Sequence, residues 1–141
     1  MIKVMLIDDD ADDREIFFEA VLEIGPLAEC ILANTATRAL EQLTASGTGL
    51  PDIIFLDVNM PVIDGWQCLG LLKGKAAFKN VPVILYSTSS HQLERQKASA
   101  LGAVGLMKKP VDFEELKEGL RAIAAHLRKG TLSSDLDFFQ A

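Results

Sequence analysis

Short apolar runs alternate along the chain with longer stretches in which apolar residues recur at helical spacing. The short runs are rich in Val, Ile and Leu and lack strict alternation, which is typical of strands buried on both faces of a sheet. They lie at residues 3–7, 30–33, 53–56, 81–86 and 103–107. The helical stretches lie at residues 12–24, 37–45, 66–72, 92–101 and 113–127. Five strand–helix units in succession predict an α/β fold with a parallel sheet and helices on both of its faces.

Residues typical of helix ends support these boundaries. A Gly-Pro pair follows the first predicted helix, where a helix terminates easily. Asp10 and Asp112 precede the first and last predicted helices, and an Asp at this position caps the free amides of the first turn. After the last helix the sequence is mostly polar, apart from the pair Phe138-Phe139. This tail either frays or docks on the domain or on a partner, and the sequence leaves both open.

Composition and charge exclude several classes of protein. A chain of 141 residues with 49% hydrophobic content can bury the core of one folded domain. Its net charge of −6 argues against a broad nucleic-acid surface, which requires a basic face. No apolar run is long enough to cross a membrane, and the first residues lack the pattern of a signal peptide. We therefore expect a cytoplasmic protein, in which Cys30 and Cys68 are free thiols.

Polar residues follow four of the five predicted strands. Asp8 and Asp9 follow the first strand and Asp57 the third, while Ser87 follows the fourth and Lys109 lies just beyond the fifth. In an open parallel sheet these strand ends meet at one edge, where ligands bind. Taken singly, each is more simply a turn, cap or surface residue. Taken together, clustered carboxylates suit Mg²⁺, and a hydroxyl with an ammonium group suits the oxygens of a phosphoryl group.

These residues resemble the receiver domain of two-component response regulators. The resemblance rests on Asp8-Asp9, on Asp57-Val58-Asn59-Met60-Pro61 with Asp64-Gly65, on Ser87 and on Lys109-Pro110. It is strongest to single-domain members of the chemotaxis-regulator or phytochrome-response-regulator type. It implies a flavodoxin-like, doubly wound sheet of five parallel strands in the order 2-1-3-4-5, with five helices. Residues 2–128 would form the receiver domain and residues 129–141 the tail.

The resemblance also implies roles for the acidic residues. Asp57 would be the phosphoacceptor. Asp8, Asp9, Asp57 and the backbone carbonyl of Asn59 would bind Mg²⁺, or Mn²⁺ in its place. Asp9 would ligate the metal directly, while Asp8 could act partly through water.

Five further residues have implied roles around the phosphoryl group. Lys109 would pair with Asp57 and then with a phosphoryl oxygen, and Ser87 would be the hydroxyl that moves on phosphorylation. Pro110 restricts the backbone of the lysine and could form the cis bond found in the family. Two positions depart from the family pattern. Leu106 replaces the usual switch aromatic, and Thr88 replaces a smaller residue and narrows access to Asp57.

The implied function is a stand-alone response regulator that accepts a phosphoryl group on Asp57 and then changes its protein contacts. It would not be an enzyme beyond its own phosphorylation and slow autodephosphorylation. The donor would be a sensor histidine kinase or a phosphotransfer protein, and the target would be an unidentified downstream protein. Direct DNA binding and a membrane are not expected. A homodimer could form through the fourth helix, fifth strand and fifth helix.

Two alternatives remain open. One is a small Mg²⁺-dependent phosphohydrolase similar to the haloacid dehalogenases, but Asp8 and Asp9 precede Asp57 instead of following it. Asn59 also stands where that mechanism needs a general acid. The other is a phosphorylation-independent interaction module with the same fold. Such modules usually lack an acid or the lysine, and this chain retains both.

Overall fold

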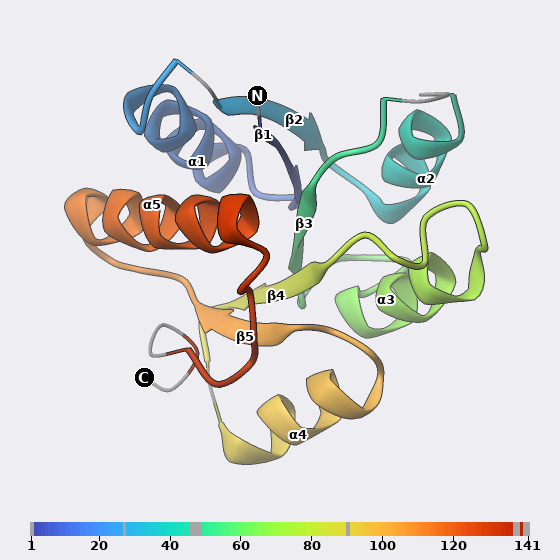
Figure 1. Ribbon diagram of the computed structural model, residues 1–141. Helices are drawn as coiled ribbons and strands as arrows, with labels where there is room; N and C mark the ends of the chain where they lie inside the picture. The colour runs from blue at the N-terminus through green and yellow to red at the C-terminus, as the bar shows by residue number, and fades with distance from the viewer. Residues whose placement is uncertain (1, 27, 46–48, 90, 137–138, 140–141) are drawn as a thin grey trace.

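The computed structural model describes residues 2–26, 28–45, 49–89, 91–136 and 139, and it contains five alternating strand–helix units (Figure 1). The strands are β1 (Ile2–Ile7), β2 (Ala28–Ala33), β3 (Ile53–Asp57), β4 (Val83–Ser87) and β5 (Gly105–Lys108). The helices are α1 (Ala11–Glu23), α2 (Ala36–Ala45), α3 (Gly65–Gly74), α4 (Gln92–Ala100) and α5 (Phe113–Lys129). Every predicted strand and helix is therefore present.

All the strands pair in parallel, and their order in the sheet is β2-β1-β3-β4-β5. The predicted flavodoxin-like topology is confirmed. The predictions placed the starts of β4 and β5 two residues too early. Pro82 has no amide hydrogen to donate to a strand pairing. The Ala103 amide donates to the Ala98 carbonyl, which extends the end of α4 and delays β5.

The helices cover both faces of the sheet. In Figure 1, α1 and α5 lie on one face, while α2, α3 and α4 lie on the other. On the α1–α5 face, Phe17 packs edge-on against Phe55 and Tyr86, with ring centroids 5.1 and 5.8 Å away. Leu56, Leu69 and Leu85 are fully buried in the core of the opposite face. The sheet is thus buried on both sides, as its uninterrupted apolar runs predict.

Side-chain caps fix where the helices near the sheet edge begin. Asp10 accepts a hydrogen bond from the amide of Asp13 at 3.0 Å, and Asp112 accepts one from the amide of Glu114 at 2.9 Å. Both predicted caps are confirmed. Asp64 and Gln67 form a reciprocal capping box at the start of α3. These caps set the short connections that follow β1 and precede α3 and α5.

The segment after α5 does not extend into solvent. Gly130 ends the helix with a left-handed φ of 69°, which turns the chain back toward the sheet. Leu132, Leu136 and Phe139 then pack against the core on the α1–α5 face. Docking on the domain, one of the two alternatives for this segment, is therefore observed at Phe139, whereas Phe138 lies outside the described residues. Among the described residues, no helix has the length and apolar character needed to span a membrane.

Candidate functional site

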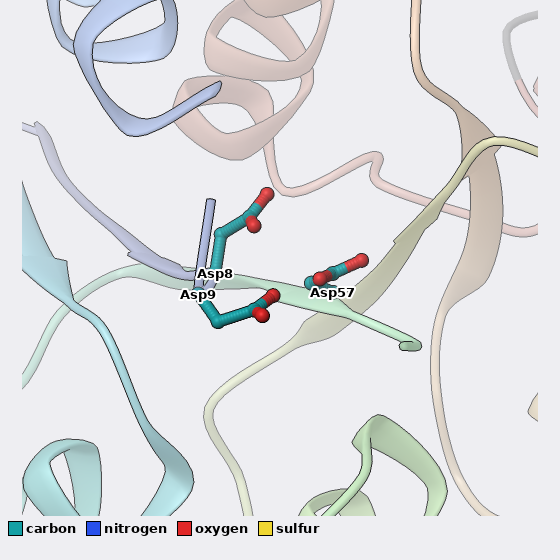
Figure 2. A group of neighbouring side chains, drawn as sticks. All are labelled: Asp8, Asp9 and Asp57. Carbon is teal, nitrogen blue, oxygen red and sulfur yellow. The ribbon is translucent and has the colours of Figure 1, made fainter. Parts of the chain in front are cut away.

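Three carboxylates meet at the carboxyl edge of the central strands. β1 and β3 are neighbours, with Ile7 aligned to Leu56, so the next residues along the two strands, Asp8 and Asp57, lie side by side. Asp8, Asp9 and Asp57 each offer an oxygen atom, and these atoms lie within 4.8 Å of one another. Figure 2 shows the three side chains directed into one space. Asp8 and Asp57 are buried, while Asp9 is exposed to solvent.

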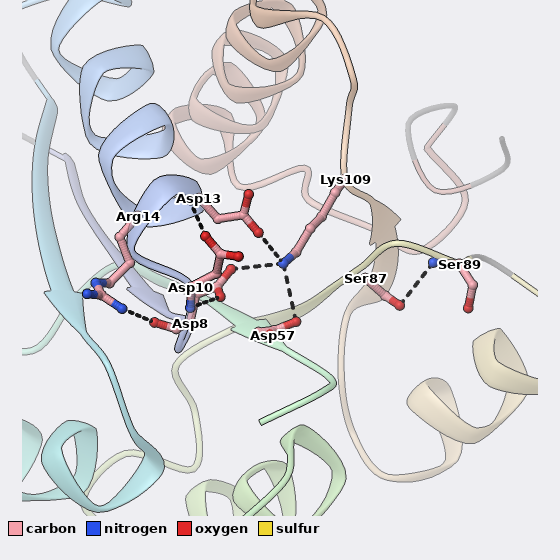
Figure 3. Close-up of polar contacts among 8 residues, drawn as sticks. All are labelled: Asp8, Asp10, Asp13, Arg14, Asp57, Ser87, Ser89 and Lys109. Atoms are coloured by element: carbon pink, nitrogen blue, oxygen red, sulfur yellow. Dashed lines mark hydrogen bonds and ion pairs between the residues drawn. The ribbon is translucent and has the colours of Figure 1, made fainter. Parts of the chain in front are cut away.

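Lys109 brings a positive charge to the same place from beyond β5 (Figure 3). Its Nζ atom lies 3.0 Å from Asp8 Oδ2, 2.8 Å from Asp13 Oδ2 and 3.4 Å from Asp57 Oδ1. The Lys109 amide also donates to the carbonyl of Ser87 at 2.6 Å, which fixes the backbone of the lysine beside the end of β4. One ammonium group thus compensates several carboxylates that are partly withdrawn from water.

This single cation does not fully neutralise the buried acids. Burial, the largest cause, and repulsion from Asp8 together raise the pKa of Asp57 to about 7 against the opposing effect of Lys109. Burial also raises the pKa of Asp8. Burial alone would lower the pKa of Lys109, but hydrogen bonds to Asp13 and Asp8 raise it overall, so the lysine stays charged. The site therefore favours an added cation, because a cation would stabilise the ionised form of Asp57.

The predicted hydroxyl and loop residues surround these charges. Asp9, Asp57, Asn59, Thr88 and Lys109 line one open cleft. Ser87 is buried next to it, and its Oγ atom accepts a hydrogen bond from the amide of Ser89 at 3.2 Å. The cleft can therefore admit a small anionic group over Asp57, with Thr88 at its rim.

The loop from Asp57 to α3 is constrained by its backbone. Val62 has φ of 65°, which is unfavourable for a β-branched residue, and the Ile63 amide bonds to the Pro61 carbonyl across it. At Gly65, a Cβ atom would overlap the carbonyl oxygen of Asp57. Glycine is needed there because the start of α3 passes directly against the backbone of Asp57.

Comparison with known proteins agrees with this geometry. Residues 4–121 match the model of the response regulator receiver domain. The chain belongs to this family. Protein PilG of Pseudomonas aeruginosa is 34% identical over 126 residues, which cover 89% of this chain and 87% of PilG.

Two solved structures show the same fold. The chemotaxis protein CheY4 of Vibrio cholerae has a TM-score of 0.74 and 27% identity, covering 87% of this chain and 98% of CheY4. The phosphorylated cyanobacterial phytochrome response regulator RcpA has a TM-score of 0.78 and 23% identity, covering 92% of this chain and 95% of RcpA. Other curated relatives are longer, and this receiver domain spans about half of their length. The comparisons thus favour the receiver interpretation over a haloacid-dehalogenase-like hydrolase.

Two expectations about the end of β5 have different outcomes. The peptide bond between Lys109 and Pro110 is trans, as are the others in the described part of the chain, so the expected cis bond is wrong. The trans form is also the intrinsically preferred one for a bond to proline. Leu106 packs inward with 1% of its surface exposed. It lies in the core between β5 and the α2–α3–α4 face, where a leucine fits without a polar partner.

The receiver site also contains two residues that sequence reasoning missed. Asp13 lies in the first turn of α1, where the helix favours an acid, and its carboxylate makes the shortest contact to Lys109. The ring of Tyr86 lies 5.4 Å from Lys109 Nζ, in cation–π range. The Asp13 contact could have been anticipated, because the first turn of α1 must lie over the end of β1. Tyr86 carried no signal beyond its place in a buried strand.

Proposed function

We propose that Asp57 is a phosphoacceptor, which takes a phosphoryl group from a phosphohistidine on a sensor histidine kinase or phosphotransfer protein. One observation carries this proposal. Asp57 lies in an open cleft beside the carboxylates of Asp8 and Asp9, which can hold a cation, and the ammonium group of Lys109 lies 3.4 Å from Asp57 Oδ1. This arrangement places a nucleophile where opposite charges can offset those of an approaching anion.

In the proposed step, a carboxylate oxygen of Asp57 bonds to phosphorus while the bond from phosphorus to the histidine nitrogen breaks. The electron pair stays on the imidazole nitrogen, which takes up a proton. Lys109, 3.4 Å from Asp57 Oδ1, is close enough to follow the new charge onto a phosphoryl oxygen. The products are an acyl phosphate on Asp57 and a neutral histidine on the donor.

The donor set fits a divalent cation with a preference for oxygen ligands. Asp8, Asp9 and Asp57, together with the backbone carbonyl of Asn59, would hold Mg²⁺ or Mn²⁺. When bound, the cation would offset the negative charge of the nucleophile and of the phosphoryl group. Arg14 donates to the carbonyl of Asp8 at 2.9 Å and so holds the backbone of this ligand in place.

Phosphorylation would be relayed through Ser87 and Thr88. In the present structure the Ser87 hydroxyl is engaged with the amide of Ser89. Turning it toward a phosphoryl group on Asp57 breaks that bond and moves the start of the β4–α4 connection. Leu106 is packed in the core and offers no hydroxyl or aromatic edge, so the relay would run through the backbone.

We further propose that residues 2–128 act as a stand-alone receiver and residues 129–141 as its tail. The output would be a change in contact with a downstream protein or with a second copy of the chain, and not an enzymatic reaction or direct DNA binding. The net charge of −6 supports the exclusion of DNA, because DNA binding relies on basic side chains.

The test is incubation with Mg²⁺ and acetyl phosphate, followed by intact mass measurement. Wild type should gain the mass of one phosphoryl group, and Asp57→Asn should gain none. EDTA should abolish the gain in wild type. Asp135→Asn removes an exposed carboxylate far along the chain and serves as the matched control, which should react like wild type. A phosphoryl adduct that survives Asp57→Asn, or none on wild type, would refute the assignment.

A further inference from the structure

The segment after α5 holds a large aromatic side chain in an unexpected place. Phe139 is 2% exposed, although the described residues before it, 131–136, form no helix or strand. Leu132 and Leu136 anchor the same segment on the α1–α5 core, and the Phe139 amide donates to the Leu136 carbonyl at 3.0 Å. The segment, defined here as residues 131–136 with Phe139, is therefore attached at several points.

Strand β5 provides the space that this ring occupies. A Cβ atom on Gly105 would lie 2.7 Å from Phe139 Cδ1 and 2.9 Å from Cε1, closer than atoms pack. Gly105 is the first residue of β5 and weakens a strand by itself, since it has no side chain to pack. Its presence is explained if the ring of Phe139 stands in for the missing side chain. Gly105 and Phe139 thus form a matched pair.

The pair lies at the outer edge of the sheet, beside α4. β5 is the last strand in the sheet order, and the segment after α5 passes this strand in Figure 1. A hollow between α4 and β5 is lined by Gln92, Arg95, Gln96, Leu106, Ser134 and Phe139. The segment therefore covers part of the surface that α4 and β5 form.

A continuous set of contacts joins this surface to the acidic cleft. The Ser87 hydroxyl accepts from the Ser89 amide, and the Ser89 hydroxyl donates to Glu94 on α4 at 2.7 Å. The next residue of α4, Arg95, donates to the Leu106 carbonyl on β5 at 3.4 Å. Movement of Ser87 toward Asp57 would release Ser89 and hence the first turn of α4, which lines the hollow around Phe139.

We propose that the segment after α5 is a built-in occupant of the α4–β5 surface, and that phosphorylation of Asp57 loosens it. Phe139 fills the position at Gly105 in the unmodified protein and shields the edge of β5. When Ser87 turns toward the phosphoryl group, the α4 side of the hollow shifts and Phe139 is held less tightly. This inference rests on the proposed function for its trigger, whereas the docking itself does not.

Docking is tested first, without any phosphodonor, by hydrogen exchange of the full chain. Phe139→Ala removes the ring, and Gly105→Ala leaves the segment intact but fills its place. Both should speed exchange of the amides in β5 and residues 131–136 by about tenfold or more. Phe18→Ala on α1 and Gly70→Ala on α3, where a Cβ atom meets open space, are the matched controls and should leave these amides unchanged. Unchanged exchange in both test variants would overturn the docking.

The trigger is tested by adding Mg²⁺ and beryllofluoride, a mimic of the phosphoryl group. Exchange of residues 131–136 should rise several-fold in wild type and should not change in Asp57→Asn. Acetyl phosphate could modify Asp57 while beryllofluoride leaves the segment protected from exchange. In that case the segment covers the edge of β5 permanently. The coupling between phosphorylation and the segment is then refuted, while the proposed function stands. If Asp57 is never modified, the proposed function fails and the coupling fails with it.

Hydrogen exchange also shows whether the Phe139 ring in the hollow comes from the same chain or from a second copy. If the protection of the amides in residues 131–136 does not depend on protein concentration, the ring comes from the same chain. Protection that falls on dilution, together with a dimer in sedimentation, would place the Phe139 of a second copy in the hollow and overturn the intramolecular assignment.

Discussion

Ionisation of Asp57 should make the metal-free protein less stable as the pH rises. Asp57 is 5% exposed and lies beside Asp8. Its burial and the negative charge of Asp8 raise its pKa from the ordinary value of 3.8 to about 7. A carboxyl group whose pKa is raised by folding stabilises the folded state while it is protonated. This contribution is complete below pH 4 and is lost as the pH rises through about 7.

The size of the effect follows from the two pKa values. A difference of about three pKa units corresponds to about 4 kcal/mol, since each unit is worth about 1.4 kcal/mol. The unfolded chain has already released this proton at pH 5, so part of the loss occurs below that pH. Between pH 5 and pH 8 the free energy of unfolding should therefore fall by about 2.5 kcal/mol because of Asp57 alone.

Urea unfolding of wild type and Asp57→Asn in EDTA measures this quantity. Asparagine has nearly the same shape and no charge, so the fall from pH 5 to pH 8 should be about 2.5 kcal/mol smaller in the variant. Comparing differences within each protein cancels the titration of shared groups that lie away from Asp57. Asp135→Asn, which removes an exposed carboxylate, should retain the wild-type profile. If the free energy of unfolding of Asp57→Asn falls as steeply with pH as that of wild type, burial does not raise the pKa of Asp57. The electrostatic description of the site would then be wrong.

Three further changes test the surroundings of Asp57. Val62→Gly should raise the free energy of unfolding, measured in urea, by about 0.5–1 kcal/mol. Val62 is 99% exposed, so little packing is lost, and its φ of 65° is costly for a β-branched residue. A less stable variant would contradict this prediction. Asp13→Asn should weaken Mg²⁺ binding in calorimetry several-fold more than Asp12→Asn, since Asp13 is the one of these two acids for which the structure records a contact with Lys109. Equal effects of the two variants would mean that only the net charge of the protein matters. Thr88→Ala should speed labelling by acetyl phosphate, because Thr88 lines the cleft; equal rates would exclude it as a steric barrier.

The fold could be predicted because its signals are local and consistent. Each strand contains a short apolar run, apolar residues recur at helical spacing between these runs, and Asp10 and Asp112 mark helix starts that the structure confirms. The predicted start of β2 is two residues too late, because Glu29 interrupts the apolar pattern, and the predicted starts of β4 and β5 are two residues too early. At β4 and β5 the apolar run includes Pro82 and Ala103, which are hydrophobic but do not belong to the strands. Hydrophobicity alone cannot distinguish a buried turn from the strand that follows it.

The gathering of the site could be predicted, but its charge pairing could not. Parallel topology brings Asp8, Asp57 and Lys109 to one edge whatever their side chains do, so their proximity follows from the order of the strands. The contact between Asp13 and Lys109 depends on the rotation of α1 over that edge, which only packing determines. The same is true of Phe139, whose partner Gly105 precedes it by many residues and looks like an ordinary weak point in a strand.

The acid-rich stretch at residues 8–13 contributes to three structural features at once. Asp8 and Asp9 belong to the carboxylate cluster, Asp10 caps α1, and Asp13 reaches across to Lys109. Because Lys109 bonds both to Asp13 and to Asp8, it ties α1 to the end of β5 as well as balancing charge. A phosphoryl group on Asp57 would compete for the same ammonium group. Phosphorylation of Asp57 should therefore weaken the Lys109 contact that links α1 to β5, and it should also move Ser87. The proposed conformational change would then begin at two places in the site.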